Sequence, residues 1–303
     1  MQENPSGFCT NSSGMVISLD IGGSSIKSGI VGAAHVLLGK PLITAIDSSR
    51  DADTLLNCFA AVIRMHLARM KPEELRGICL AFPGPFDYER GICYIKDQAK
   101  YAQLYGIAIG DRLNALLALR NTALKFTGDA KAAILGEARY GAGNEFNRII
   151  GITLGTGLGS AFIENGKVIT TAEGIPENGW LYAVPFKGRI ADETFSSRGI
   201  SAALSEAGIA DEELSCVTAR ARDGNTAIHN VFTAFGHELG TFLRPFVKSF
   251  RADAVLVMGG IARAIDLFGE PLASILPVPV IRSHLSVAAP LLGAADSIFQ
   301  PGN

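Results

Sequence analysis

The segment MVISLDIGGSSIKSGIV, residues 15–31, constrains the fold of this chain more than any other. Its first apolar run ends at Asp20, the turn Gly22, Gly23 and Ser24 follows, and a second apolar run completes it. This pattern predicts a β-hairpin. Backbone N–H groups in such a turn can bind phosphate oxygens, and a carboxylate beside them can hold a divalent cation. An ordinary hairpin with a hydrogen-bonded Asp explains the segment equally well, so the rest of the chain must decide.

Two further apolar runs also lead into glycine turns. Residues 149–154 precede Gly155, Thr156 and Gly157, and residues 253–258 precede Gly259 and Gly260. A bound nucleotide requires converging N–H donors for its phosphates and a close approach of the backbone. Three such turns on one chain therefore favour a nucleotide site over three unrelated turns.

Two common nucleotide-binding motifs do not fit these turns. The glycines at 155, 157 and 159 do not match GxGxxG, and the residues after them predict a strand and an Asn-Gly hairpin. A dinucleotide-binding fold requires a helix start at that point. The sequence GxxxxGK[ST] does not occur either, which argues against a P-loop enzyme.

The composition excludes several classes of function. The 303 residues are 48% hydrophobic, enough for more than one lobe, and a net charge of -2 gives no basic excess for nucleic-acid binding. Five scattered cysteines without a CxxC pair argue against a disulfide framework and favour a reducing compartment. The polar N-terminus lacks an apolar signal region, and no apolar run reaches membrane-spanning length. We therefore expect a cytoplasmic protein without membrane contact.

Strand-like runs alternate with helical periodicity along the chain, which predicts an α/β fold. Both halves open with an apolar strand, a glycine turn and a second strand, which suggests two lobes that face each other across a cleft. We expect a disordered leader over residues 1–14, a first lobe over 15–127 plus 287–303, and a second lobe over 128–286.

Two local expectations concern the second half of the chain. Helical periodicity predicts a long helix over residues 226–250, in which Pro245 should cause a kink or a division into two helices. Residues 171–198 show no strong periodicity, so we expect a loop there.

Six segments together resemble a known family. They are LDIGGSSIKSGIV, AFPGPFDYERG, TGDAKAAILGEARYGAG, GITLGTGLGSAFIENGK, VLVMGGI and PLLGAADSIF. In this order and spacing they resemble the ROK family of sugar kinases and repressors, within the actin-like ATPase superfamily. The resemblance extends from about Val16 onward. It implies two actin-like (ribonuclease H-like) lobes and a homodimeric kinase that uses ATP and Mg²⁺ to phosphorylate a hexose or hexose derivative.

The resemblance also implies roles for the motif residues. Asp20 to Ser25 would form the first phosphate loop, including Gly22, Gly23 and Ser24, with Asp20 near Mg²⁺, directly or through water. Gly155 to Gly157 would form the second phosphate loop, and Gly259 with Gly260 the adenosine turn. Asp129 matches the general base, which accepts the proton of the sugar hydroxyl. Taken alone, the position of Asp129 favours a helix N-cap, and the flanking segments in register favour the base.

On the sugar side, the chain departs from the family pattern. Gly84, Gly128, Glu177, Trp180 and Asp192 are the expected substrate contacts, but Gly128 stands where the family usually has Asn. Trp180 stands where the family has His, and it can stack on a sugar face but cannot ligate zinc. The family's Cys-rich zinc motif is absent from residues 184–196, so we expect no zinc site. Asp192 or Glu193 could replace the sugar-binding Glu that follows that motif.

Two other functions stay open at this point. The changed sugar motif is compatible with a sugar-sensing regulatory protein that has lost catalysis, although Asp20 and Asp129 count against it. Only about fourteen polar residues precede the first strand, too few for a helix-turn-helix domain. An actin-like ATPase that does not act on sugars is the third possibility. The sequence does not identify the sugar.

Overall fold

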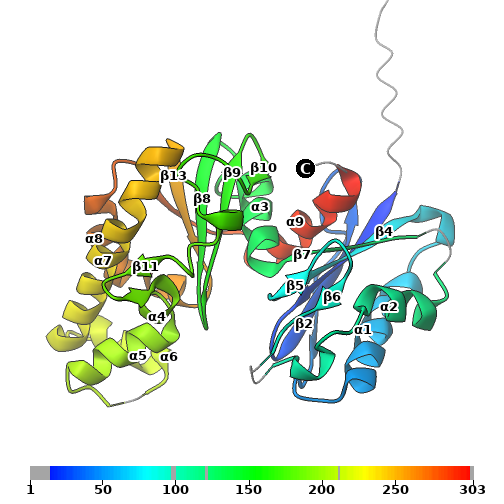
Figure 1. The fold of residues 1–303 in the computed structure, drawn as a ribbon, viewed down its shortest axis with the longest axis horizontal. Helices are drawn as coiled ribbons and strands as arrows, with labels where there is room; N and C mark the ends of the chain where they lie inside the picture. Colours follow the sequence, from blue (N-terminus) through cyan, green and yellow to red (C-terminus); the bar gives the residue numbers. More distant parts are fainter. Residues whose placement is uncertain (1–13, 97–99, 120–121, 211, 301–303) are drawn as a thin grey trace, which may run out of the picture.

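Two five-stranded mixed sheets form the framework of the protein (Figure 1). The computed structural model describes residues 14–96, 100–119, 122–210 and 212–300. All but the last residue of the expected leader, 1–14, lies outside these ranges. The first sheet has the order β3-β2-β1-β4-β7, with strands Met15–Ile21 (β1), Ser25–Gly32 (β2), Leu42–Ala45 (β3), Leu75–Phe82 (β4) and Ala123–Gly128 (β7).

The second sheet repeats the topology of the first. Its order is β10-β9-β8-β13-β14, with strands Arg148–Leu154 (β8), Leu158–Glu164 (β9), Lys167–Ile169 (β10), Ala254–Met258 (β13) and Val280–Arg282 (β14). In each sheet an antiparallel three-stranded meander continues into two parallel strands. The predicted α/β fold with two similar halves is confirmed.

The helices cover both faces of each sheet. They are Ala52–Leu67 (α1), Ile109–Leu117 (α2), Asp129–Tyr140 (α3), Ala191–Thr194 (α4), Ser197–Glu206 (α5), Leu214–Arg222 (α6), Thr226–Phe250 (α7), Ile265–Ile275 (α8) and Ala288–Phe299 (α9). Figure 1 shows α1 and α2 outside the first sheet, α7 and α8 outside the second, and α3 and α9 between the sheets. Within the described ranges, no helix combines the length and apolarity that crossing a bilayer requires.

Alternation along β1 shows how the sequence builds these layers. Ile17, Leu19 and Ile21 belong to the core that includes α1, whereas Val16 packs into the core that includes α9. Ser18, on the α9 face, donates a buried hydrogen bond of 2.7 Å to the Leu291 carbonyl. The period of two therefore buries both faces of the strand and fixes α9 against it.

The crossing of α3 and α9 depends on two glycines. A Cβ on Gly136 would overlap the carbonyl oxygen of Ala289, and a Cβ on Gly293 would overlap that of Ala132. Only glycine allows the two helix backbones to approach so closely. Because α9 contacts β1, β2, β4 and β7 and α3 contacts β8 and β9, this crossing joins the two sheets.

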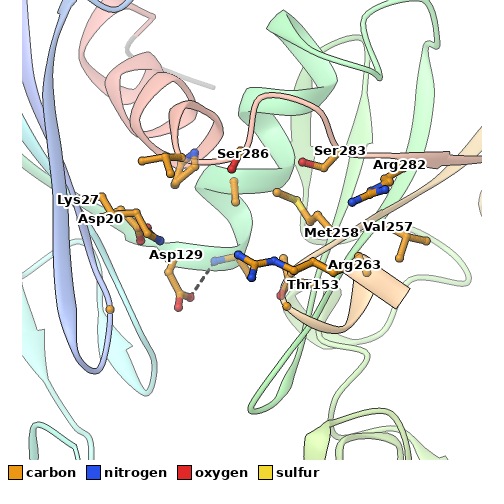
Figure 2. Close-up of a pocket in the computed structure, with 18 residues that line it drawn as sticks. Asp20, Lys27, Asp129, Thr153, Val257, Met258, Arg263, Arg282, Ser283 and Ser286 are labelled. Atoms are coloured by element: carbon orange, nitrogen blue, oxygen red, sulfur yellow. Dashed lines mark hydrogen bonds and ion pairs between the residues drawn. The ribbon is translucent and has the colours of Figure 1, made fainter. Parts of the chain in front are cut away.

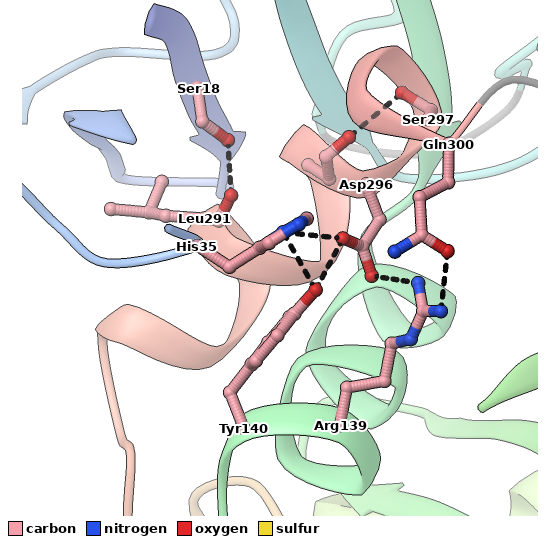
Figure 3. A network of polar contacts seen from close by, with 9 residues as sticks. Ser18, His35, Arg139, Tyr140, Leu291, Asp296, Ser297 and Gln300 are labelled. Carbon is pink, nitrogen blue, oxygen red and sulfur yellow. Dashed lines mark hydrogen bonds and ion pairs between the residues drawn. The ribbon is translucent and has the colours of Figure 1, made fainter. Parts of the chain in front are cut away.

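A buried polar network closes one end of the same crossing (Figure 3). The Asp296 carboxylate on α9, only 1% exposed, accepts hydrogen bonds from Arg139 Nη1 at 2.7 Å and the Tyr140 hydroxyl at 2.6 Å. His35 Nδ1, from the loop after β2, lies 3.0 Å from the same carboxylate. The fully buried charge is thus matched by an arginine and a phenol, as a buried carboxylate requires.

Two local expectations change in detail. Residues 226–250 form one helix, so Pro245 does not divide it, and the kink stays a prediction. Pro245 lies on the exposed face, where water can bind the carbonyl that lacks a partner, while buried residues on either side hold α7 on the core. The expected loop over 171–198 contains elements too short to give periodicity: a 3₁₀ turn at Glu177–Gly179, strands Pro185–Phe186 (β11) and Arg189–Ile190 (β12), and α4.

The helix crossing generates a stability prediction. Gly293→Ala introduces a methyl group where the α3 backbone already lies, so we expect a loss of about 1–3 kcal/mol in the free energy of unfolding. Gly260→Ala is the matched control, because Gly260 has helical dihedrals (φ -63°, ψ -41°) and open space in the Cβ direction. Urea unfolding measures both variants. Equal stability of the two would contradict the close-contact account.

Candidate active site

A cleft of about 490 Å³ lies between the two sheets (Figure 2). Its lining comes from the glycine turn after β1, the start of α3, the turn after β13, and the segment between β14 and α9. This volume suits a nucleotide-sized ligand. The lining residues that carry charge are Asp20, Lys27, Asp129, Arg263 and Arg282.

Asp20 and Lys27 lie side by side at one wall of the cleft. They are directly opposed in the antiparallel register of β1 and β2, and Lys27 Nζ lies 2.7 Å from Asp20 Oδ2. Only 9% of the Asp20 side chain is exposed. A cross-strand ion pair therefore holds this carboxylate toward the cleft, with a cation already against it.

Asp129 is the first residue of α3. Its Oδ1 accepts a 2.8 Å hydrogen bond from the Ala130 N–H. Gly128 occupies the cap position before the helix, and Asp129 binds one N–H of the first turn. Burial raises the pKa of the Asp129 carboxyl, and the Asp20 charge raises it further, while the Ala130 hydrogen bond and the Lys100 charge lower it. The net shift is upward, as a proton acceptor requires.

Two glycines of these turns leave their backbone open to a ligand. Nothing lies within 4 Å of a Cβ built on Gly155 or on Gly260, so a ligand can approach the bare backbone there. Gly259 adopts φ +98°, and a Cβ on it would overlap the Leu154 carbonyl. This close packing sets the third turn against the end of β8, beside the second turn.

Glu137 on α3 fixes one wall of the cleft through its buried carboxylate. Glu137 is fully buried, and its Oε1 accepts hydrogen bonds of 2.6 Å from the Ser283 hydroxyl and from the Leu285 N–H. Its Oε2 accepts a 3.0 Å bond from the Ala142 N–H. Ser283 lines the cleft, so the helix that carries Asp129 also positions the opposite wall.

The structure brings together some of the predicted site residues. Asp20, Gly22, Asp129, Gly259 and Gly260 line the cleft. The remaining predicted residues are not among its lining, and they are Gly23, Ser24, Gly84, Gly128, Gly155, Thr156, Gly157, Glu177, Trp180 and Asp192. Five of these belong to the first and second glycine turns. Their roles stay predictions.

Tyr88 is a site residue that sequence reasoning missed. Its hydroxyl donates a 3.1 Å hydrogen bond to the Phe82 carbonyl. The same oxygen lies 3.3 Å from the place that a Cβ on Gly128 would take, and 3.4 Å from that on Gly84. Burial, and then the Asp129 charge, raise the pKa of the phenol. Tyr88 therefore fills the space that the small residue at 128 leaves. In the sequence, only Gly84 and Gly128 indicated this space.

Asp192 supports the second glycine turn. Its Oδ1 accepts a 2.6 Å hydrogen bond from the Leu158 N–H, and its Oδ2 forms an ion pair with Arg198. Both oxygens thus have protein partners. Trp180 is 39% exposed, with its ring 5.9 Å from that of Tyr182.

The cleft fits a magnesium–nucleotide ligand. Mg²⁺ takes oxygen ligands and needs only one or two carboxylates when phosphates supply the others. Asp20 already pairs with a cation, and Asp129 faces the same cleft. Among the described residues, no group of three or more His, Cys, Asp and Glu side chains could hold a metal ion alone.

Comparisons with known proteins agree with this geometry. A sequence model described as the ROK family matches residues 16–296. A glucokinase from Thermotoga maritima is 23% identical, over 93% of this chain and 96% of its own. A ROK family glucokinase from Streptomyces griseus, solved with glucose and AMPPNP, superposes with a TM-score of 0.72 at 20% identity, over 93% of this chain and 98% of its own. An inorganic polyphosphate/ATP-glucomannokinase from Arthrobacter sp. strain KM gives 0.66 at 26% identity, over 94% and 98%.

The raised pKa of Asp129 predicts a gain in stability upon neutralisation. Its ionised form is disfavoured in the folded state, so wild type carries a penalty above the folded pKa that is absent below the unfolded pKa. Asp129→Asn should therefore raise the melting temperature at neutral pH, and the gain should shrink as the pH falls.

Asp266→Asn is the matched control, with the opposite sign. The hydrogen bond from Arg222 lowers the pKa of Asp266, so its contribution is present at neutral pH and is lost as the pH falls. Thermal unfolding from about pH 2 to pH 8 measures both variants, because the contribution of Asp266 is lost only below its ordinary pKa of 3.8. A lower melting temperature of Asp129→Asn at neutral pH would show that its charge is not destabilising.

Proposed function

We propose, on the premise that this chain belongs to the ROK family, that it is a kinase which transfers a phosphoryl group from ATP to a hydroxyl of a hexose or hexose derivative. The observation that carries the proposal is the position of Asp129. This half-buried carboxylate with a raised pKa shares one cleft with Asp20 and with residues of the first and third glycine turns.

The chemistry requires one proton acceptor and well-placed charges. The sugar hydroxyl oxygen forms a bond to the terminal phosphorus, and the bond from that phosphorus to the bridging oxygen breaks. The electron pair leaves with ADP, and Asp129 accepts the hydroxyl proton. Mg²⁺, held near Asp20, neutralises phosphate charge when it is bound.

The remaining lining suits a nucleoside. Val257, Met258, Val287 and Pro290 form an apolar section beside the third glycine turn, where a base can pack. Ser286 and Arg282 add polar groups at its edge. The second turn, from Gly155 to Gly157, would bind phosphates, as proposed for the first.

Inorganic polyphosphate is a second candidate donor. Three cations line the cleft, Lys27, Arg263 and Arg282, and Figure 2 shows Arg263 extending into it. Converging cations suit a polyanion that has no base to anchor it. The Arthrobacter enzyme of similar fold is named for both donors. Replacement of ATP by polyphosphate in the assay distinguishes them.

The acceptor side would be formed by Gly84, Gly128, Glu177, Trp180 and Asp192, with Tyr88 supplying the hydroxyl that the small residue at 128 cannot. The enzyme would act without zinc, because residues 184–196 lack the Cys-rich motif. Its composition favours a cytoplasmic location, and the family resemblance implies a homodimer. The alternative is a sugar-sensing protein without catalysis, and the two carboxylates of the cleft count against it.

The first test is a coupled assay with ATP, Mg²⁺ and a panel of hexoses and N-acetylated hexosamines. We expect one or more sugars to be phosphorylated, and Asp129→Asn to lower kcat about 10²–10⁴-fold, the usual contribution of a general base. Binding of a sugar, seen as a rise in melting temperature without any phosphorylation, would favour the regulatory alternative. Substantial activity of Asp129→Asn would overturn the base assignment.

The second test concerns Tyr88 and sugar recognition. Tyr88→Phe keeps the ring but removes the hydroxyl, so KM for the sugar should rise about tenfold, the effect of one hydrogen bond, while KM for ATP stays constant. Tyr94→Phe is the control, because the Tyr94 side chain is 40% exposed and its ring faces that of Tyr105. An unchanged sugar KM in Tyr88→Phe would remove Tyr88 from the acceptor site.

A further inference from the structure

Lys100 lies beside the first glycine turn, outside every motif that the sequence suggests. Its Cδ lies 3.6 Å from the place that a Cβ on Gly23 would take, so the aliphatic stem crosses the bare backbone of the turn. The residue is half-buried. A lysine that covers a phosphate-binding turn brings its ammonium to the place where phosphate oxygens would lie.

The next residue, Tyr101, fixes this position. Tyr101 is fully buried, and its hydroxyl donates a 2.6 Å hydrogen bond to the Gly22 carbonyl, within the same turn. Its N–H donates to the Ser48 carbonyl at 2.8 Å. Its backbone is left-handed, with φ +58°, a conformation uncommon for residues other than glycine and often found at functional sites. The attachment point of Lys100 is therefore tied to the turn.

The charges around Lys100 place it near the candidate base. Burial raises the pKa of Asp129, and among the weaker influences the Lys100 charge lowers it, so the two groups lie within electrostatic reach. Lys27 is already paired with Asp20 at 2.7 Å. Within the described ranges, no carboxylate forms such an ion pair with Lys100. Its ammonium thus lies near the base and the phosphate turn without being bound to either carboxylate.

We propose that Lys100 is a further catalytic residue, whose ammonium contacts the phosphoryl group during its transfer from the donor to the sugar hydroxyl. This inference rests on the proposed kinase function. During the step the oxygen–phosphorus bond to the sugar forms, the bond to the bridging oxygen breaks, and the proton passes to Asp129. Lys100 neither gains nor loses a proton. It offsets charge on the equatorial oxygens of the phosphoryl group, which a fixed cation in a partly buried site does effectively.

The test uses Lys100→Met, which keeps the stem and removes the charge, in the full-length protein with ATP and the preferred sugar. We expect kcat to fall about 100-fold, the effect of removing one stabilising group, while KM for the sugar changes little. The dissociation constant of AMPPNP, measured by calorimetry, should stay within about threefold. Binding of ADP with aluminium fluoride and sugar, which imitates the transferred group, should weaken about 100-fold.

Two variants complete the experiment. Lys96→Met is the matched control and should keep full activity, because Lys96 is exposed and lies 6.0 Å from the Tyr105 ring. Lys100→Arg should restore part of kcat, because it restores the charge.

If the wild type phosphorylates a sugar and Lys100→Met has the same kcat, the role of Lys100 is overturned and the proposed kinase function stands. A loss of AMPPNP affinity as large as the loss of kcat would also overturn that role, since Lys100 would then only bind the donor. A wild type that phosphorylates no sugar would overturn the proposed function, and this inference with it.

Discussion

The contact between α3 and α9 at Gly136 and Gly293 determines the arrangement of this protein. Each glycine lies against a carbonyl of the other helix, so any side chain at either position would force the helices apart. Because α9 is fixed to the first sheet and α3 packs on the second, the crossing sets the distance between the sheets. The same helix carries Asp129 at its start and Glu137 two turns later. The position of the proton acceptor and of the opposite cleft wall therefore depends on one close backbone contact.

The two cleft carboxylates differ in how their charge is stabilised. Asp20 has a cation at 2.7 Å, whereas Asp129 is half-buried and accepts a backbone hydrogen bond from Ala130, with no ion pair to it among the described residues. A carboxylate with so little compensation is a better base and a poorer contributor to stability. The contrast with Asp296 is instructive, since that buried carboxylate has an arginine and a phenol and serves the helix crossing. The charge of the proposed base, Asp129, is thus only partly compensated, whereas the charge of Asp296, which holds the helix crossing, is fully compensated.

The sequence predicted those features that are local in the chain. Apolar runs before glycine turns located three strand ends, and the resemblance to the ROK family identified Asp129 as the candidate base. Tyr88, Lys100 and Glu137 were not predicted, because each acts through contacts formed only on folding, such as Tyr88 above Gly128. Pro245 does not divide α7, because burial on both sides holds the helix together. Asp192 illustrates the same limit, since its partner Leu158 is 34 residues away.

The account requires that one ligand engage all three glycine turns together. Hydrogen–deuterium exchange with AMPPNP and Mg²⁺, compared with the free protein, tests this most directly. The account predicts slower exchange at residues 20–25, 155–158 and 259–264, and unchanged exchange at the Asn165–Gly166 hairpin turn between β9 and β10. Saturating AMPPNP that leaves any of the three turns unprotected would contradict the shared nucleotide site.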